Sequence, residues 1–330
     1  MPLSVQKLVS RLTLRQLQVF KAVYEKQSYS KAGELLGLTQ PAVSSQIRQL
    51  EQALDQPVFE YVGRRLFCTA AGERLALSIN AIFSELRDLQ TDLAALEGKV
   101  AGELRLVAVN TSQYVVPYLL RAFLALYPQI TVSVSVVNRA AAIQRLNDNS
   151  DDLVIMGMVP TDRPLASLPF LDNELVPVVP DGHPLLQLSH VSPQQFLDAG
   201  LLVREGGSGS RRALEIHCQE QRLNITPAME IGSNDALKHA VIAGLGVAVI
   251  PKLSILPELE IGSLKIVDLP GFPLRRSWCV VYPQAKHPTP AMKAFIDYIQ
   301  QNIRQFEQVF LRREQIGHTS AAAALTRDSL

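Results

Sequence analysis

The sequence lacks any long apolar stretch. No hydrophobic run approaches the roughly 18 residues that a membrane-spanning helix needs, although 47% of the 330 residues are hydrophobic. The first residues, MPLSVQKLVSRLTLRQ, show neither the apolar core nor the small-residue cleavage site of a secretory signal. We therefore expect a cytosolic protein without a membrane partner.

Cysteine and histidine are too few and too scattered for familiar metal chemistry. Cys68, Cys218 and Cys279 match neither metal-site spacing nor an even-numbered disulfide framework, so we expect small buried or half-buried side chains. None of the six histidines pairs with Cys or Glu at a metal-ligand spacing. Neither a G-x-S-x-G elbow nor a Walker A loop occurs. The sequence thus predicts no cofactor, no metal and no catalytic residues, and it disfavours an enzyme on an α/β scaffold.

Charge is distributed unevenly along a chain whose net charge is only +1. Residues 1–75 hold 10 Lys and Arg against 6 Asp and Glu, a balance of +4, whereas residues 76–330 hold 22 against 25, a balance of −3. A basic end on a slightly acidic body indicates a module that binds a polyanion. The length of the chain suggests about two or three domains.

The basic end shows a helix-turn-helix pattern followed by a hairpin. Residues 13–26 place apolar side chains at helical spacing, and Ser30 is a candidate N-cap for a second helix that stops at Gly37. After a two-residue turn, a third helix starts at Gln40. Residues 58–67 have the pattern of a small β-hairpin, or wing. Two short helices joined by a tight turn after a supporting helix predict a helix-turn-helix.

The third helix, in LTQPAVSSQIRQLE, has a polar face without a carboxylate between Gln40 and Arg48. The major groove of DNA admits one α-helix, whose amide and guanidinium groups can read base edges, and small hydroxyls allow close approach. A solvated polar face is the commoner alternative for any one helix, but the adjoining turn and wing favour DNA binding. The expected DNA contacts are Ser30, Lys31, Gln40, Pro41, Ser44, Ser45, Arg48, Arg64 and Arg65.

A long helix is expected over about residues 71–97. Its apolar residues alternate at spacings of four and three, which predicts a seam between two helices and hence a dimer. The alternative is an amphipathic helix packed on its own chain, although such a face tends to be wider. The seam residues are Leu75, Ile79, Ile82, Leu86, Leu89, Leu93 and Leu96.

From residue 103 onward, strand and helix patterns alternate, as in ELRLVAV, SQYVVPYLLRAFLALYP and ITVSVSVV. Such alternation predicts parallel sheet with covering helices. A second series of this kind follows, and the pattern near residue 276 returns to the first. We therefore expect two lobes, the second inserted in the first, with a cleft between them.

Several strand-to-helix junctions in this half could bind an anion, because helix N-termini expose N–H groups where ligands of parallel sheets bind. The loop REGGSGSRR is the most informative, since its glycines permit close backbone approach. An ordinary helix cap is the alternative at each junction. The expected ligand-binding residues are Thr111, Ser112, Gln113, Asn138, Arg139, Ser208, Ser210, Arg211 and Ser233.

These features resemble the LysR-type transcriptional regulators over essentially residues 13–305. The resemblance is most specific in QLQVFKAVYEKQSYSKAGELLGLTQPAVSSQIRQLEQALDQPVFE and the following GRRLFCTAAG. Tyr61 stands where many members have Arg, Ala70 where many have Pro, and Ser45 where several have Arg. These three differences affect which DNA contacts the wing and the third helix make, but not the assignment of the helix-turn-helix.

The resemblance implies an α/β protein with an α-rich winged helix-turn-helix domain and a two-lobed effector domain like periplasmic binding proteins. It also implies a dimer through the linker helix, commonly a homotetramer, that binds double-stranded promoter DNA and acts on RNA polymerase. The expected segments are a DNA-binding domain at 1–70, a linker helix and hinge at 71–100, an effector domain at 101–312 (lobe I about 101–170 and 276–305, lobe II about 171–275) and a disordered tail at 313–330.

A narrower resemblance lies in NRAAAIQRLNDNSDDLVIMGMVP, PFLDNELVPVVPDGHPL and GSNDALKHAVIAGLGVAVIP. These segments resemble the branch that regulates CO2-fixation and inorganic-carbon genes in autotrophs, including cyanobacteria. That branch implies a phosphorylated or dicarboxylate effector, such as 2-phosphoglycolate, ribulose bisphosphate or 2-oxoglutarate. A LysR-type regulator of another pathway, and a solute receptor without DNA function, are the alternatives.

Overall fold

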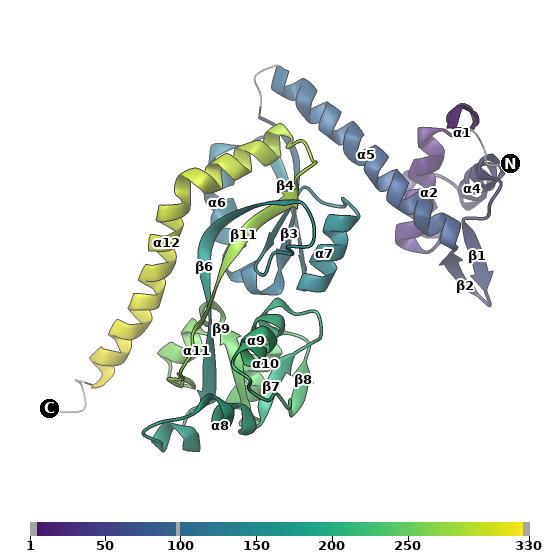
Figure 1. Ribbon diagram of the computed structural model, residues 1–330. Helices are drawn as coiled ribbons and strands as arrows, with labels where there is room; N and C mark the ends of the chain where they lie inside the picture. The colour runs from purple at the N-terminus through teal and green to yellow at the C-terminus, as the bar shows by residue number, and fades with distance from the viewer. Residues whose placement is uncertain (1–4, 97–99, 326–330) are drawn as a thin grey trace. The chain divides into compact units, whose positions relative to one another are not determined.

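A computed structural model describes residues 5–96 and 100–325, with side chains defined for most of them (Figure 1). Residues 97–99, within the linker expected at 71–100, lie outside the described residues. Contacts divide the chain into two units, Met1–Asp88 with Asp148–Ser150, and Leu89–Asn147 with Asp151–Leu330.

The first unit is a winged helix. Four of its helices bury a common apolar cluster, in which Phe20, Val43, Ile47 and Leu50 are at most 1% exposed. The hairpin pairs two short antiparallel strands, so both the helix-turn-helix and the wing form as the sequence predicts. The elements are α1 (Val5–Arg11), α2 (Leu14–Lys26), α3 (Tyr29–Leu36), α4 (Gln40–Leu54), β1 (Phe59–Val62) and β2 (Arg65–Cys68), followed by α5 (Ala70–Leu96), whose residues from Leu89 onward belong to the second unit.

Local capping residues determine where α3 and α4 begin and end. Thr39 accepts a hydrogen bond from Ala42 N (3.4 Å) and thereby starts α4. Gly37 ends α3 in the left-handed conformation, at φ 65°, which glycine adopts without a steric penalty. The prediction that Ser30 caps α3 is wrong. Ser28 is the cap, because its extended backbone lets its hydroxyl accept from the N–H three residues on, whereas Ser30 already lies inside the helix.

The apolar row on α5 has two parts. Ile79 is 1% exposed in the winged-helix core, and Leu75 packs against the same cluster. The first two seam positions therefore serve the fold of their own chain. The next four are 40–55% exposed, which is high for aliphatic side chains, and they are Ile82, Leu86, Leu89 and Leu93. Leu96 belongs to α5, but its side chain lies outside the described residues.

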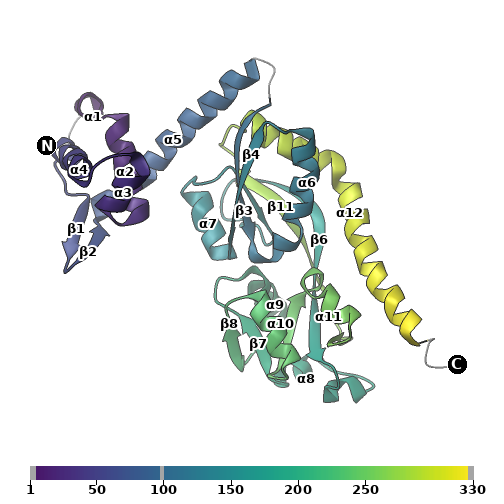
Figure 2. The ribbon, with the colours of Figure 1, turned by 180° about the vertical axis from the view of Figure 1, so that it is seen from behind.

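The second unit contains one mixed sheet that carries two lobes (Figures 1 and 2). Its strands follow the order β4-β3-β5-β11-β6-β9-β7-β8, and β10 pairs with β6. The strands are β3 (Gly102–Val109), β4 (Ile130–Val137), β5 (Leu153–Met156), β6 (Leu165–Pro180), β7 (Leu201–Arg204), β8 (Met229–Ile231), β9 (Val247–Pro251), β10 (Leu264–Ile266) and β11 (Leu274–Pro283).

Each lobe has a parallel part, as the alternating pattern predicts. In lobe I, β3 pairs in parallel with β4 and β5, and in lobe II, β7 pairs in parallel with β8 and β9. The long strands β6 and β11 join the lobes as an antiparallel pair, with β5 beside one end of the pair and β9 beside the other. Lobe II is thus inserted into lobe I through two crossing strands.

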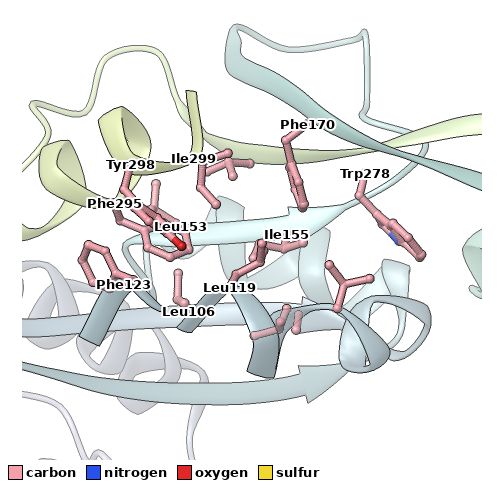
Figure 3. Packing of buried hydrophobic residues seen from close by; sticks show 14 of the residues in the cluster. Leu106, Leu119, Phe123, Leu153, Ile155, Phe170, Trp278, Phe295, Tyr298 and Ile299 are labelled. Carbon is pink, nitrogen blue, oxygen red and sulfur yellow. The ribbon is translucent and has the colours of Figure 1, made fainter. Parts of the chain in front are cut away.

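Helices cover both lobes. In lobe I, α6 and the N-terminal part of α12 enclose large buried side chains that include Phe123, Phe170, Trp278 and Phe295 (Figure 3), while α7 packs on a separate apolar cluster. Lobe II has its own clusters on the two sides of its strands. The helical elements are η1 (Asn110–Tyr114), α6 (Val116–Leu126), α7 (Arg139–Asn147), η2 (Pro184–Gln187), α8 (Pro193–Asp198), α9 (Gly209–Glu220), α10 (Asn234–Ile242), η3 (Lys252–Ser254), α11 (Leu256–Glu260) and α12 (Pro290–Leu325).

The C-terminal segment departs from expectation. Residues 313–330 were expected to be disordered, but α12 continues as far as Leu325. The run AAAAL near its end supplies residues of high helix propensity, which explains why the helix can extend past the packed core. Residues 326–330 lie outside the described residues.

Candidate nucleic-acid interface and ligand cleft

The outer face of α4 is polar and shallowly grooved. Val43, Ile47 and Leu50 turn into the core, and this fixes the opposite face of the helix toward solvent. No acidic side chain lines the groove, so nothing on it would repel a phosphate backbone. It is lined by Gln40, Pro41, Ser44, Ser45, Arg48, Gln49 and Gln52.

The cations around this face are free to contact DNA. Lys31 is exposed in the first turn of α3, beside Ser30, and Arg64 and Arg65 are exposed at the turn between β1 and β2. Within the described part of the chain, no ion pair engages Lys31, Arg48 or the two wing arginines. A guanidinium without a carboxylate partner can bind a phosphate or the edge of guanine. Gln49 and Gln52, which sequence reasoning omitted, continue the same face by helical spacing.

The second candidate site is a cleft between the lobes. It draws residues from the carboxyl ends of β3, β4, β5 and β7, the start of α9 and the crossing strands β6 and β11. Five of the nine predicted ligand-binding residues line it, namely Thr111, Asn138, Arg139, Ser208 and Ser210. The other lining residues are Val109, Asn110, Gly157, Met158, Asn173, Leu175, Arg204, Gly209, Ala213 and Arg276.

The structure places the remaining four predicted residues outside the cleft lining. Ser112 is buried and donates to Val109 O (2.9 Å), and Ser233 accepts from Ala236 N as the cap of α10. Arg211 points away from the cleft and pairs with Glu215 and Glu230. Gln113 lines a separate groove with Tyr114, Tyr118 and Phe310. Three of them therefore serve the local fold.

Two of the three arginines in the cleft and two asparagines, Asn110 and Asn173, were not predicted from the sequence. Arg204 ends β7 directly before the Gly-rich loop, so its position after a strand was a usable signal. Asn173 and Arg276 lie inside β6 and β11, in stretches that look like ordinary strand. Only the pairing of two segments about 100 residues apart in sequence turns these side chains toward the cleft.

Positive charge dominates the cleft. Arg204 is 3% exposed and neutralised by Glu205, with Asn234 accepting from its Nη1 (2.5 Å). Arg139 and Arg276 have no ion-pair partner among the described residues, and Arg139 Nε donates only to the carbonyl of Met158 (2.8 Å). Burial lowers the pKa of the Arg139 guanidinium, and the nearby Arg212 lowers it further. The cleft therefore favours an anion.

The lobes approach closely at this edge. Ala140 N donates to Gly207 O (3.1 Å), and Asn138 Nδ2 donates to Glu205 (3.4 Å). A Cβ on Gly207 would lie 2.9 Å from the Cβ of Ala140, so this glycine, at φ 98°, permits the contact. The free space inside the cleft measures only about 30 Å³, room for no more than a few water molecules. A metabolite must therefore enter through some separation of the lobes.

The segments that contain the two candidate sites match known protein families. Residues 14–73 match the bacterial regulatory helix-turn-helix protein, lysR family, and residues 97–304 match the LysR substrate binding domain. The chain belongs to the LysR family of transcriptional regulators. The fold class and the DNA-binding head that the sequence predicts are thereby confirmed, and the cleft lies in the substrate-binding domain of the LysR regulator.

Its curated relatives are similar over nearly their whole length. The chain is 38% identical to a RuBisCO operon transcriptional regulator of Acidithiobacillus ferrooxidans, over 88% of this chain and 94% of that protein. It is also 38% identical to the HTH-type transcriptional activator CmpR of Synechocystis, over 87% and 94%. The predicted resemblance to regulators of CO2-fixation genes is confirmed at the level of these relatives.

Solved structures of two other proteins are similar to this chain. The CcmR regulatory domain of Synechocystis, solved in complex with 2-PG, is 33% identical, with a TM-score of 0.57 over 60% of this chain and 96% of that domain. Full-length CbnR complexed with its target DNA has a TM-score of 0.67 over 88% and 99%, at 20% identity, and supports the fold.

The described residues of the LysR regulator contain neither a membrane-spanning helix nor a cluster of metal ligands. None of its described helices has the length and apolarity needed to cross a bilayer. Likewise, no group of three or more His, Cys, Asp or Glu in the described ranges could hold a metal ion. Cys218 is buried, while Cys68 and Cys279 are half-buried and free, as expected.

Proposed function

We propose that this LysR regulator binds promoters of CO2-fixation or inorganic-carbon genes under the control of a small anionic metabolite. It acts in the cytoplasm, where bacterial DNA lies, and has no catalytic activity. The relatives support the target genes, since two of them are named for the RuBisCO operon. The effector class rests on one observation, the convergence of Arg139, Arg204 and Arg276 on one nearly closed cleft.

The effector is proposed to be a phosphorylated or dicarboxylate acid of two to five carbons. Two of the three guanidinium groups have no carboxylate partner in the described chain, so a ligand with at least two negative charges would balance them. The similar CcmR domain binds 2-PG, which has this charge. Buried positive charge without a counter-ion is costly, and an anionic ligand relieves that cost when it binds.

The DNA contacts are proposed to divide between bases and phosphates. Gln40, Ser44 and Arg48 lie on the exposed face of α4 and would read base edges in the major groove. Ser45, Pro41 and the polar start of α3 would set the approach of the helix to the backbone. Arg64 and Arg65 would contact phosphate or the minor groove from the wing.

The active assembly is proposed to be a homodimer through α5 that pairs into a tetramer and contacts RNA polymerase at the promoter. The exposed leucines of α5 would form the seam, starting at Ile82 because the preceding two positions are used by the winged-helix core. Effector binding would act through lobe closure, and it shifts the assembly only to the extent that the ligand binds one arrangement more tightly than the other.

The test is a DNase I footprint of the full-length protein on the DNA upstream of its own gene and upstream of carbon-fixation genes. Each reaction is repeated with 2-phosphoglycolate, ribulose bisphosphate, 2-oxoglutarate and inorganic phosphate. A protected site whose length or affinity changes with one of the organic acids supports the proposal. A specific footprint that no acid alters would refute the effector class, and the absence of any specific footprint would refute the target genes.

A further inference from the structure

Asn173 and Arg276 form a pair at the point where the two lobes join. They lie directly opposite each other in the antiparallel register of β6 and β11, and both line the cleft. Residues opposite each other on paired strands share one face of the sheet, with Cβ atoms about 5 Å apart. Because these strands cross between the lobes, the pair sits on the connection about which the lobes can move.

Among the described residues, nothing forms a hydrogen bond with the side-chain amide of Asn173. The residue is 7% exposed, its Oδ1 is buried without a partner, and no hydrogen bond within the described chain fixes either end of the amide. A buried amide left unpaired costs about 1–3 kcal/mol, and such exceptions call for an explanation. Since nothing holds the group, it can turn its Nδ2 toward an acceptor that enters the cleft.

Arg276 can donate hydrogen bonds to the same acceptor. Its Nη1 donates to Arg275 O (2.8 Å) and its Nε lies 3.3 Å from Met158 Sδ, so no carboxylate satisfies it. A guanidinium and an amide side by side offer several N–H donors to one planar anion. A carboxylate fits this donor set, because Arg binds both of its oxygens in a fork.

Asn173 and Arg276 form one anion-binding pole of the cleft. A second anion-binding pole lies across the cleft at the start of α9. Ser208 occupies the N-cap position without capping the helix through its side chain; its hydroxyl instead shares a 3.0 Å hydrogen bond with that of Ser210. Arg139 borders this helix start, since a Cβ on Gly209 would lie 3.5 Å from its Cδ. Free helix N–H groups, two hydroxyls and a guanidinium suit a phosphoryl group.

Met158 separates the two poles. Its carbonyl accepts from Arg139 Nε (2.8 Å) and its sulfur lies next to Arg276 Nε. The poles are therefore about one residue apart, a gap that a chain of a few carbon atoms can span. A monoanion, or a compound with one charged end, would leave one pole empty.

Building on the proposed function, we propose that the effector is a two-headed anion held in one orientation. Its phosphoryl end lies on Arg139 and the start of α9, and its carboxylate end lies on Arg276 and Asn173. The pair on the crossing strands is then the specificity determinant that distinguishes a phosphorylated acid from a phosphate ester without a carboxylate.

The experiment is isothermal titration of the full-length protein with 2-phosphoglycolate and with ethyl phosphate, which keeps the phosphoryl group but lacks the carboxylate. Arg276→Gln and Asn173→Ala should each weaken 2-phosphoglycolate binding, Arg276→Gln by about 10- to 100-fold, the worth of a charge-assisted hydrogen bond. Both should leave the weaker affinity for ethyl phosphate within about twofold of wild type. Arg139→Gln should weaken both ligands. Circular dichroism confirms that each variant is folded.

Arg275→Gln is the matched control. Arg275 neighbours Arg276 on β11 but turns to the other face, where it pairs with Glu174 and its side chain is 75% exposed. It should bind both ligands as wild type does. If Arg276→Gln weakens both ligands equally, or neither, the two-headed orientation is overturned while the anion site stands. If the wild-type protein binds neither ligand but its DNA footprint responds to another acid, only the orientation and phosphoryl assignment fail. Absence of any anion effect overturns the proposed function as well.

Discussion

The polar face of α4 and the cleft between the lobes are built in opposite ways. All seven residues of the α4 face lie between Gln40 and Gln52 on one helix. The cleft collects its lining from residues 109 to 276, on several strands and helix starts. A helix brings side chains three and four positions apart onto one face by its own geometry, whereas the cleft exists only after two lobes have folded and met.

The two regions also differ in what their charges do without a ligand. Arg48 is exposed and unpaired within the described chain, so it is poised for DNA and contributes little to folding. Arg204 is buried and holds Glu205, Asn234 and the carbonyl of Gly232. A side chain on the α4 face can therefore be removed without destabilising the fold. Removing a buried side chain from the cleft lowers the stability of the domain as well as changing ligand binding.

The largest effect is expected for dimer formation, when the exposed apolar row of α5 is changed. Like the α4 face, this row is built on a single helix. Leu86→Glu combined with Leu89→Glu should raise the dimer dissociation constant at least about 100-fold, because each buried leucine is worth about 1.5–3 kcal/mol. Analytical ultracentrifugation measures the change. Leu77→Glu, also on α5 but outside the row, is the control. A double variant that sediments like wild type would count against the seam.

The next effect compares two arginines directly. Arg204→Ala should lower the free energy of unfolding of the effector domain by about 2–3 kcal/mol, because the half-buried Glu205 loses its ion-pair partner and the side chain of Asn234 loses a hydrogen-bond donor. Arg48→Ala should change the free energy of unfolding of the winged-helix domain by no more than about 0.5 kcal/mol, as for other exposed positions. Urea denaturation followed by circular dichroism gives both values. Equal losses of unfolding free energy in the two variants would contradict the claim that only the cleft arginine stabilises its domain.

A smaller but specific loss is expected for DNA binding. Ser44→Ala combined with Arg48→Ala should reduce affinity for the footprinted site about 10- to 100-fold, since a good base contact contributes about 1–3 kcal/mol. Binding to unrelated DNA should fall much less. Arg74→Ala, a change of an exposed arginine on α5, serves as the control in the gel shift. An unchanged footprint would remove α4 from the recognition role.

The smallest effect concerns single hydroxyls of the cleft. Ser208→Ala or Thr111→Ala should weaken effector binding about fivefold, the worth of one neutral hydrogen bond of about 1 kcal/mol. DNA binding without effector should stay at the wild-type level. Calorimetry and a gel shift on the same samples separate the two readouts. Ser233→Ala, at the cap of α10 and outside the cleft lining, should leave effector affinity unaltered.

Sequence reasoning succeeded where structure is local. The Thr39 cap, the Gly37 stop and the apolar spacing of α4 all act within a few residues, so the helix-turn-helix could be predicted in order. The same reasoning misplaced one cap by two residues, because Ser28 and Ser30 are equally good candidates by type. It also assigned Leu75 and Ile79 to the dimer seam, whereas both pack in the winged-helix core, because the two uses give the same periodicity.

In the cleft, sequence reasoning found the helix starts but not the strands. Ser208 and Arg139 follow visible strand-to-helix junctions, whereas Asn173 and Arg276 carry no signal beyond being polar in a strand. Their function depends on the register of β6 against β11, set by tertiary packing over about 100 residues. Likewise, Arg211 looks suited to an anion by sequence, yet its rotation on α9 directs it to Glu215 and Glu230.

The sequence by itself determined three things: the DNA-binding head, the alternation of strands and helices, and the family. Each of them follows from the spacing of residues that are near one another in the chain. Only the tertiary structure decided which side chains share the cleft, which leucines remain exposed on α5, and which cations lack a partner. These properties depend on contacts between segments far apart in the chain, and spacing along one strand or helix does not encode them.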